Sequence, residues 1–195
     1  MGTFLTILGI NNVGKTTQQK LLEERLRSEG YKVAHVKYPK YDLAPTGPRI
    51  NAYLRGGNPE GISAEEFHSL LIQNRTDFAP QLDKLISEND VVIAEMYVGT
   101  GIAYGMGDGL DKNELIARNE HLRPADISIL LDGSRFLQAR EANHHYENDD
   151  EKSEHVRLGH LELANDFGWD VLDANQTIPE VHAQIYSIVM KELQK

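Results

Sequence analysis

The fold of this chain is decided by the stretch Gly9-Ile10-Asn11-Asn12-Val13-Gly14-Lys15-Thr16, with Thr17 after it. The stretch satisfies the pattern G-x-x-x-x-G-K-[ST] in full. It follows an apolar run at residues 4–8, which predicts a buried strand, and it opens a segment at residues 15–29 whose leucines have helical spacing. A glycine-rich turn between a strand and a helix is a P-loop, in which backbone N–H groups surround the phosphates of a nucleotide. The sequence therefore predicts a nucleotide-binding protein.

Two side chains of this loop have specific expected roles. Lys15 is expected to be catalytic, because its ammonium group can neutralise the outer phosphates of ATP. The Thr16 hydroxyl is the expected ligand of Mg²⁺. The N-terminus of the following helix adds a favourable dipole for the phosphates. The residues predicted to bind ATP are Gly9, Ile10, Asn11, Asn12, Val13, Gly14, Lys15, Thr16 and Thr17.

Strands and helices alternate along the rest of the chain. This alternation predicts an α/β fold, namely the three-layer P-loop NTPase fold with a five-stranded parallel sheet flanked by helices. A polar stretch at residues 143–154 predicts a mobile surface loop, and the length of 195 residues predicts a single domain over residues 1–195. Beyond the P-loop, the predicted strands are residues 32–36, 91–94, 127–131 and 171–172, and the predicted helices are residues 63–86 and a last helix from about Thr177.

The composition favours a small nucleotide pocket over a broad binding surface. The chain has 20 basic and 30 acidic side chains, for a formal net charge of -10. Proteins that bind duplex DNA or anionic membranes normally carry the opposite charge, so we expect neither partner. The sequence has no cysteine, which excludes disulfides and thiolate metal sites. No apolar run approaches the roughly 20 residues needed to cross a bilayer, and no signal peptide is visible, so we expect a cytoplasmic protein.

A P-loop predicts nucleotide binding but does not identify a reaction. GTPases need a base-reading N-K-x-D segment, which this sequence lacks. Motor and helicase ATPases are larger. Small kinases are therefore the leading class.

Ordered blocks along nearly the whole chain resemble the thymidylate kinase family. Gln73-Asn74-Arg75 resembles the family's A-N-R stretch in a long helix. The other blocks are Tyr38-Pro39 with Thr46-Gly47, residues 91–95 followed by Thr100, Ala103 and Tyr104, residues 125–132, and His145-Tyr146-Glu147. The resemblance implies transfer of a phosphoryl group from ATP to a deoxynucleoside monophosphate, either dTMP or a related nucleotide. It also implies Mg²⁺ as cofactor, a homodimer, and a short lid at about residues 143–154, in which His145-Tyr146-Glu147 resembles the family's R-Y-E stretch.

The acceptor site follows from the same blocks. Glu95 ends an apolar strand, where a parallel sheet presents its ligands. A carboxylate there can hold Mg²⁺, directly or through water, or orient the acceptor, so we expect Glu95 to be catalytic and metal-binding. In the family the arginine that corresponds to Arg75 contacts the monophosphate, and the position of Lys37 often holds an arginine near the acceptor phosphate. The expected substrate-binding residues are Lys37, Tyr38, Leu71, Arg75, Met96, Thr100 and Tyr104.

Four positions depart from the family pattern. Met96 replaces the arginine of the D-R pair, and methionine cannot form charge-assisted hydrogen bonds to phosphate. Leu71 replaces the aromatic residue that stacks on thymine. His145 replaces a lid arginine, for which protonated histidine would be a weaker substitute. Gly105 replaces the glutamine of A-Y-Q. Arg140, just before the lid, is the best remaining candidate for a catalytic cation.

These departures leave three functions open. The first is an active deoxynucleoside-monophosphate kinase, which would phosphorylate monophosphates only. The second is a deoxynucleoside kinase, a class that often carries E-R-S after the same strand, so that Glu95 fits it and Met96 does not. The third is a catalytically degenerate, nucleotide-binding regulator, which would bind ATP without transferring a phosphoryl group.

Overall fold

The centre of the molecule is a parallel sheet. The computed structural model describes residues 2–134, 145–146 and 149–194, and within them the sheet has five strands in the order β2-β3-β1-β4-β5. All neighbouring strands are parallel, which confirms the predicted α/β class. All five residues of β3 are buried, because helices cover both faces of the sheet. The strands are β1 (Thr3–Leu8), β2 (Val33–Lys37), β3 (Val91–Glu95), β4 (Ile127–Asp132) and β5 (Asp170–Asp173).

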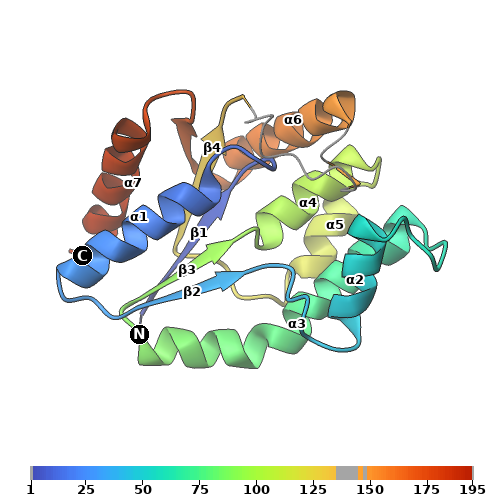
Figure 1. Cartoon of the computed structure of the whole chain (residues 1–195), viewed down its shortest axis with the longest axis horizontal. Helices are drawn as coiled ribbons and strands as arrows, with labels where there is room; N and C mark the ends of the chain where they lie inside the picture. Colours follow the sequence, from blue (N-terminus) through green and yellow to red (C-terminus); the bar gives the residue numbers. More distant parts are fainter. Residues whose placement is uncertain (1, 135–144, 147–148, 195) are drawn as a thin grey trace.

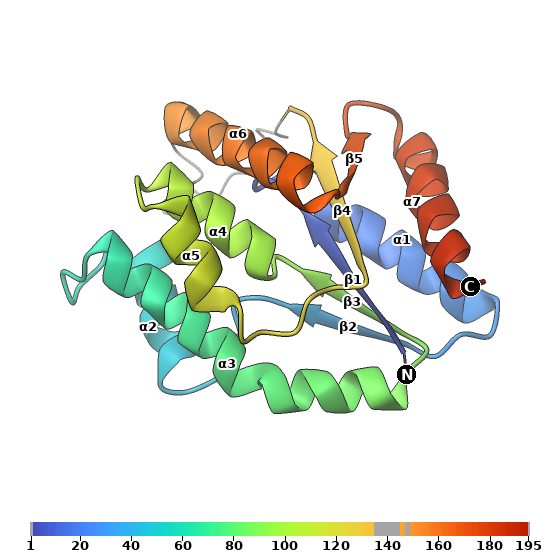
Figure 2. The ribbon, with the colours of Figure 1, turned by 180° about the vertical axis from the view of Figure 1, so that it is seen from behind.

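The helices form the two outer layers. Helices α1 and α7 lie side by side against one face, while α3 and α6 lie on the other (Figures 1 and 2). Helix α4 packs closely against α6, and α2 packs against α3. The described helices are α1 (Lys15–Ser28), α2 (Thr46–Arg55), α3 (Ala64–Glu88), α4 (Val98–Gly107), α5 (Lys112–Asn119), α6 (Asp150–Phe167) and α7 (Ile178–Leu193).

The register of the central strands places the candidate site at one edge of the sheet. Glu95 pairs with Ile7 of β1 on one side and with Lys37 of β2 on the other. The P-loop follows β1 directly, so the phosphate-binding turn, the lysine and the carboxylate meet where the strands end. Helices α2 and α4 lie beyond this edge (Figure 1). The sheet therefore presents its ligands at its carboxyl edge.

Part of the predicted lid segment is helical. Asp149 accepts a hydrogen bond from the Lys152 backbone N–H at 2.9 Å and so caps α6. Residues 150–154 of the predicted lid are therefore the first residues of this helix. Of the rest of the predicted lid, residues 143–144 and 147–148 lie outside the described residues.

Candidate active site

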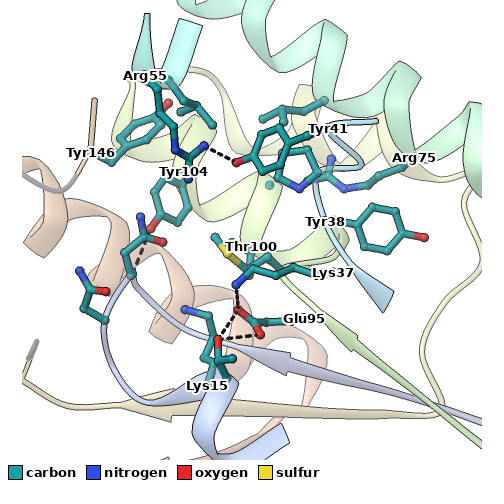
Figure 3. A pocket seen from close by; sticks show the side chains of 18 of the residues that line it. Lys15, Lys37, Tyr38, Tyr41, Arg55, Arg75, Glu95, Thr100, Tyr104 and Tyr146 are labelled. Atoms are coloured by element: carbon teal, nitrogen blue, oxygen red, sulfur yellow. Dashed lines mark hydrogen bonds and ion pairs between the residues drawn. The ribbon is translucent and has the colours of Figure 1, made fainter. Parts of the chain in front are cut away.

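A cavity of about 390 Å³ opens at the carboxyl edge of the sheet. Side chains from the P-loop, the segment after β2, the end of α2, the N-terminal half of α3 and the first turns of α4 form its walls (Figure 3). It brings together every substrate-binding residue that the sequence predicted, as well as most of the P-loop. The predicted site residues that line it are Asn11, Asn12, Gly14, Lys15, Thr16, Thr17, Lys37, Tyr38, Leu71, Arg75, Glu95, Met96, Thr100 and Tyr104.

The P-loop holds Lys15 in a buried position at the floor of this cavity. Only 5% of Lys15 is exposed, and its Nζ donates a hydrogen bond to the Ile10 carbonyl at 2.6 Å. Gly9 has a φ of 135°, and a Cβ there would lie 2.5 Å from the Leu131 carbonyl oxygen, so the loop needs glycine at this point. Ile10 and Val13 are buried, and they contribute backbone rather than side chains to the loop. The ammonium group is thus fixed before any phosphate binds.

Glu95 joins the P-loop to β2. Its carboxylate accepts hydrogen bonds from the Thr16 hydroxyl at 3.0 and 3.1 Å, and it forms an ion pair with Lys37 Nζ at 2.8 Å. Burial alone would raise the pKa of Glu95, but the hydrogen bond from Lys37 and the charge of Lys15 outweigh burial and lower it. Glu95 is therefore ionised at neutral pH. An ionised carboxylate beside a threonine hydroxyl is a donor set that suits Mg²⁺.

Arg75 is a buried cation at the other end of the cavity. It is 5% exposed, and among the described residues its Nε has no hydrogen-bond partner. Burial lowers the pKa of Arg75 to about 10, against the effect of the nearby Tyr97 and Tyr38. Gly101 of α4 leaves room for the guanidinium, since a Cβ there would lie 2.3 Å from Arg75 Nη2. A buried donor without a protein partner in a cavity indicates a ligand-binding position.

Tyr38 lines the cavity with its ring rather than with its hydroxyl. The hydroxyl points away from the other labelled side chains (Figure 3). The ring lies 5.1 Å from the Tyr97 ring and 5.9 Å from the Phe78 ring, measured between centroids. Tyr38 therefore supports the wall behind Arg75 with its ring.

Seven further residues line the cavity that the sequence did not single out as site residues: Pro39, Tyr41, Leu54, Arg55, Phe67, Gly101 and Tyr146. Arg55 Nη1 donates a hydrogen bond to the Tyr41 hydroxyl at 3.0 Å (Figure 3). Phe67 precedes Leu71 and Arg75 on α3 at four-residue intervals, so all three share one face of the helix. The sequence placed Phe67 in an apolar helix stripe, and the four-residue spacing was the available signal that it accompanies Leu71.

Tyr146 closes the cavity above the P-loop. Its ring meets the Tyr104 ring edge to face, with 4.7 Å between centroids. The Tyr104 hydroxyl in turn accepts a hydrogen bond from the Asn11 backbone N–H at 3.2 Å. Tyr104 thus links the lid residue to the phosphate-binding loop (Figure 3).

A buried carboxylate at the end of α4 holds this part of the lid. Asp108 accepts hydrogen bonds from the Tyr146 hydroxyl and from His68 Nε2, the latter at 2.8 Å, and it pairs with Lys152 Nζ at 2.5 Å. Burial raises the pKa of Asp108, but the bonds from His68, Lys152 and Tyr146 outweigh it and lower the pKa to about 2. One side chain therefore connects α3, α4, α6 and the lid residue Tyr146.

Replacing Asp108 by asparagine is expected to lower the free energy of unfolding by about 2 kcal/mol, because the amide leaves the partly buried Lys152 ammonium group without its counter-charge. The melting temperature should fall by about 4–8 °C at pH 7. The pKa of Asp108 lies below its usual value, so its contribution is complete above about pH 4 and disappears as the pH falls through about 2. The difference between wild type and variant should shrink over that interval in thermal unfolding experiments.

Asp111 supplies the matched control. It caps α5 by accepting a hydrogen bond from the Glu114 backbone N–H at 2.9 Å, and asparagine caps helices equally well. Asp111→Asn should leave the melting temperature unchanged. An equally small effect of Asp108→Asn would show that the buried network adds no stability.

Three residues that the sequence singled out remain to be placed: Arg140, His145 and Gly105. Arg140 lies outside the described residues. The idea that protonated His145 replaces a lid arginine is not supported, because burial and the nearby Lys152 lower the pKa of His145, and Lys152 Nζ lies 3.3 Å from its Nε2. At Gly105 a Cβ would lie 2.6 Å from Leu115, so α5 occupies the space of a larger residue.

A second cavity of about 420 Å³ lies on the other side of the P-loop from the first. It borders Ile10, the end of β4 and the loop after β5, and its walls are polar. Arg157 of α6 lies there and binds the Asp132 carboxylate with two hydrogen bonds of 2.6 and 2.9 Å. This cavity was not predictable from local sequence, because its residues come from four separate segments.

Comparisons with known proteins agree with this geometry. A family model described as thymidylate kinase matches residues 7–185. The chain is 31% identical to a probable thymidylate kinase of Thermococcus kodakarensis, over 95% of this chain and 96% of that protein. It is 27% identical to a thymidylate kinase of Plasmodium falciparum, over 97% and 90% of the two chains. The solved structure of a Candida albicans thymidylate kinase superposes with a TM-score of 0.84 at 23% identity, covering 98% of this chain and 92% of that one, and supports the fold. With its P-loop, parallel sheet and near-complete coverage, the chain belongs to the thymidylate kinase family.

Proposed function

We propose that this protein transfers the γ-phosphoryl group of ATP to the phosphate of dTMP, giving ADP and dTDP. The chain belongs to a family of nucleoside-monophosphate kinases, and the observation that carries the proposal is a single cavity. That cavity joins the buried Lys15 of the P-loop to the buried Arg75, with Lys37 and Glu95 along its wall. A donor site and an acceptor site that share one cavity allow direct transfer between two phosphates.

The donor nucleotide spans the P-loop. Lys15 and the backbone of residues 9–17 bind the outer phosphates of ATP. The polar cavity beyond Ile10 lies next to this loop and has room for the remainder of the nucleotide. Because the transferred group carries its charge on its outer oxygens, a fixed Lys15 ammonium stabilises the transition state without having to reorganise.

The acceptor lies across the first cavity from Lys15. Its phosphate faces the P-loop, where the Lys37 ammonium group neutralises it and Glu95 holds Lys37 in place at 2.8 Å. Arg75 lies apart from Lys15 at the opposite end of the cavity (Figure 3). We therefore assign Arg75, with Leu71 and Phe67, to the nucleoside rather than to the phosphate that the resemblance implied.

Thr16 and Glu95 are the residues that would hold Mg²⁺, directly or through water. Their oxygens are 3.0 Å apart and face the P-loop, and the carboxylate is ionised. The ion supplies neutralisation of the charge on the ATP phosphates. Among the described residues no cluster of three or more histidines and carboxylates offers another site.

Replacing Glu95 by glutamine is expected to lower kcat about tenfold and to raise the Mg²⁺ concentration that gives half the maximal rate. The amide keeps the shape of the side chain but removes the charge that holds both Lys37 and the ion. Initial rates at fixed ATP over a Mg²⁺ series would measure this shift.

Glu88→Gln is the matched control for this variant. Glu88 lies at the far end of α3 from the cavity, and its only ion pair within the described part of the chain is with Lys84 at 3.8 Å on the surface. Its Mg²⁺ dependence should equal that of the wild type. If Glu95→Gln also kept the wild-type Mg²⁺ dependence, Glu95 would not belong to the metal site.

The experiment that tests the function is a product assay with Mg-ATP and a panel of nucleosides and nucleoside monophosphates, analysed by chromatography. Formation of dTDP from dTMP, and no product from thymidine, is the expected result. Product from nucleosides alone would identify a nucleoside kinase. Confirmed ATP binding without any product would identify a nucleotide-binding regulator.

We further propose a cytoplasmic homodimer, which rests on the family resemblance, the acidic composition and the lack of cysteine. None of the helices in the described ranges combines the length and the apolar character that crossing a bilayer requires. Light scattering coupled to size-exclusion chromatography should give twice the chain mass of 22.0 kDa.

A further inference from the structure

A buried histidine stands directly behind the acceptor cavity and is not part of the proposed chemistry. His160 of α6 is 1% exposed, and its Nε2 lies 3.4 Å from the Thr100 hydroxyl of α4. Its Nδ1 lies 2.9 Å from the carbonyl oxygen of Val156, one turn earlier on α6. Thr100 lines the cavity between Lys15 and Arg75 (Figure 3). His160 therefore reaches the site through its polar contact with Thr100 and through the Tyr104 ring, which it meets edge to face at 6.2 Å between centroids.

These contacts fix the tautomer of His160. A backbone carbonyl can only accept a hydrogen bond, so the proton of the neutral ring is on Nδ1 and the lone pair is on Nε2. Burial lowers the pKa of His160 to about 4, and the charges of Lys15 and Asp132 act on it in opposite directions. The ring is therefore neutral at physiological pH, and Nε2 faces Thr100 as an acceptor.

The fixed tautomer determines how the Thr100 hydroxyl is oriented. Because Nε2 carries no proton, the hydroxyl must donate its own proton to the histidine. No other hydrogen bond of the Thr100 side chain is present in the described structure. The hydroxyl oxygen then presents only lone pairs to the cavity. A phosphate dianion or a base carbonyl has no proton to offer it, so neither forms a hydrogen bond with Thr100 in this state.

We propose that His160 is a positioning residue that makes Thr100 an obligatory hydrogen-bond acceptor, which recognises an N–H or O–H group of the acceptor nucleotide. This inference rests on the proposed function. In dTMP two groups have that chemistry, namely the N3–H of the base and the 3′-hydroxyl of the sugar. Thr100 thus selects for a donor on the nucleoside and takes no part in holding the phosphate.

Steady-state kinetics on three acceptors test the proposal: dTMP, N3-methyl-dTMP and 3′-deoxy-dTMP. Thr100→Val removes the hydroxyl but keeps the shape, and we expect it to lower kcat/KM for dTMP about tenfold. Thr100→Ser keeps the hydroxyl, so it should keep the preference for dTMP over the analogue that lacks the recognised donor. With the wild type, kcat/KM should be about tenfold lower for the analogue that lacks the recognised donor than for dTMP. In Thr100→Val, kcat/KM for that analogue should not fall further.

The role of His160 is tested by the preference for dTMP, which is the ratio of kcat/KM for dTMP to kcat/KM for the analogue that lacks the recognised donor. In His160→Phe the Thr100 hydroxyl keeps its lone pairs but is no longer held as an acceptor, so the preference for dTMP over that analogue should fall part of the way toward that of Thr100→Val. The double variant should be no worse than either single variant, because the two residues act as one unit. Independent, multiplying effects would overturn the proposal, and so would an unchanged preference in Thr100→Val or equal rates with all three acceptors.

A spectroscopic measurement on the wild type does not depend on how well the variants fold. NMR of the imidazole nitrogens should show His160 as the neutral Nδ1–H tautomer between about pH 6 and 8. An Nε2–H tautomer or an imidazolium would overturn the proposal. The proposed function fails separately, if the wild type phosphorylates no monophosphate at all.

Discussion

Replacing Lys15 by alanine is expected to lower kcat/KM for dTMP phosphorylation by about a thousandfold or more. Lys15 is buried to 5% exposure on the floor of the cavity and fixed by its 2.6 Å bond to the Ile10 carbonyl. A fixed cation contributes most where charge develops in the transition state and water is largely excluded, because the local dielectric is low. No other described cation lines the cavity from within the P-loop, so the loss has no local substitute.

Lys20→Ala is the matched control for Lys15→Ala. Lys20 lies on the same helix, α1, but its side chain is exposed to solvent. Its removal should leave kcat/KM within about twofold of the wild type. Steady-state rates and equilibrium binding of ATP would separate lost transfer from lost binding. Wild-type turnover by Lys15→Ala would rule out the P-loop as the phosphate site.

The sheet and the P-loop were predictable because each depends on local sequence. Strands buried on both faces are continuous apolar runs, and β3 is such a run. The strand boundaries moved by only one residue, as at β1 and β2. The start of α3 was predictable too, since Ser63 and Glu66 form the capping box that their spacing indicated.

Helix α4 was not predictable, because packing rather than propensity creates it. Its sequence contains four glycines, which disfavour an isolated helix. In the fold those glycines allow close contacts: a Cβ at Gly99 would lie 2.4 Å from Trp169, and one at Gly107 would lie 2.5 Å from Val156. Neighbours distant in sequence therefore decide the conformation of this segment, and the same holds for the position of Thr100 within it.

The residues of the candidate site likewise fall into two groups, those that local sequence predicts and those whose roles depend on distant contacts. Glu95 and the P-loop were expected together, since the carboxyl ends of parallel strands share one edge. Arg55 and Asp108 were not expected, because their roles depend on contacts with Tyr41 and Tyr146 across the fold. A sequence shows which residues can bind phosphate, but it does not show which distant side chain closes the cavity above them.

Replacing Arg75 by methionine is expected to lower kcat/KM for dTMP about a hundredfold and at the same time to raise the free energy of unfolding of the unliganded protein by about 1 kcal/mol. Methionine has a similar length but makes no hydrogen bond to the acceptor. The gain in stability follows from burial, because the guanidinium is 5% exposed and its Nε lacks a partner among the described residues. A buried charge that becomes paired only when a ligand binds destabilises the unliganded protein.

The pKa of Arg75 determines the pH range in which the wild type and Arg75→Met differ in stability. Burial lowers that pKa to about 10, so the buried group is charged at neutral pH, and its cost is relieved only as the pH rises through about 10. Thermal unfolding at pH 7 without nucleotide is therefore the sensitive condition.

Arg49→Met controls for the loss of an arginine as such. Arg49 is exposed, binds Glu60 on the surface at 2.6 Å and does not line the cavity, so neither its turnover nor its melting temperature should change appreciably. A lower kcat/KM together with a higher melting temperature, in Arg75→Met but not in Arg49→Met, would show that Arg75 serves ligand binding at a cost in stability. A loss of both together would instead mean that the buried guanidinium stabilises the fold, and the acceptor site would then have to be assigned without it.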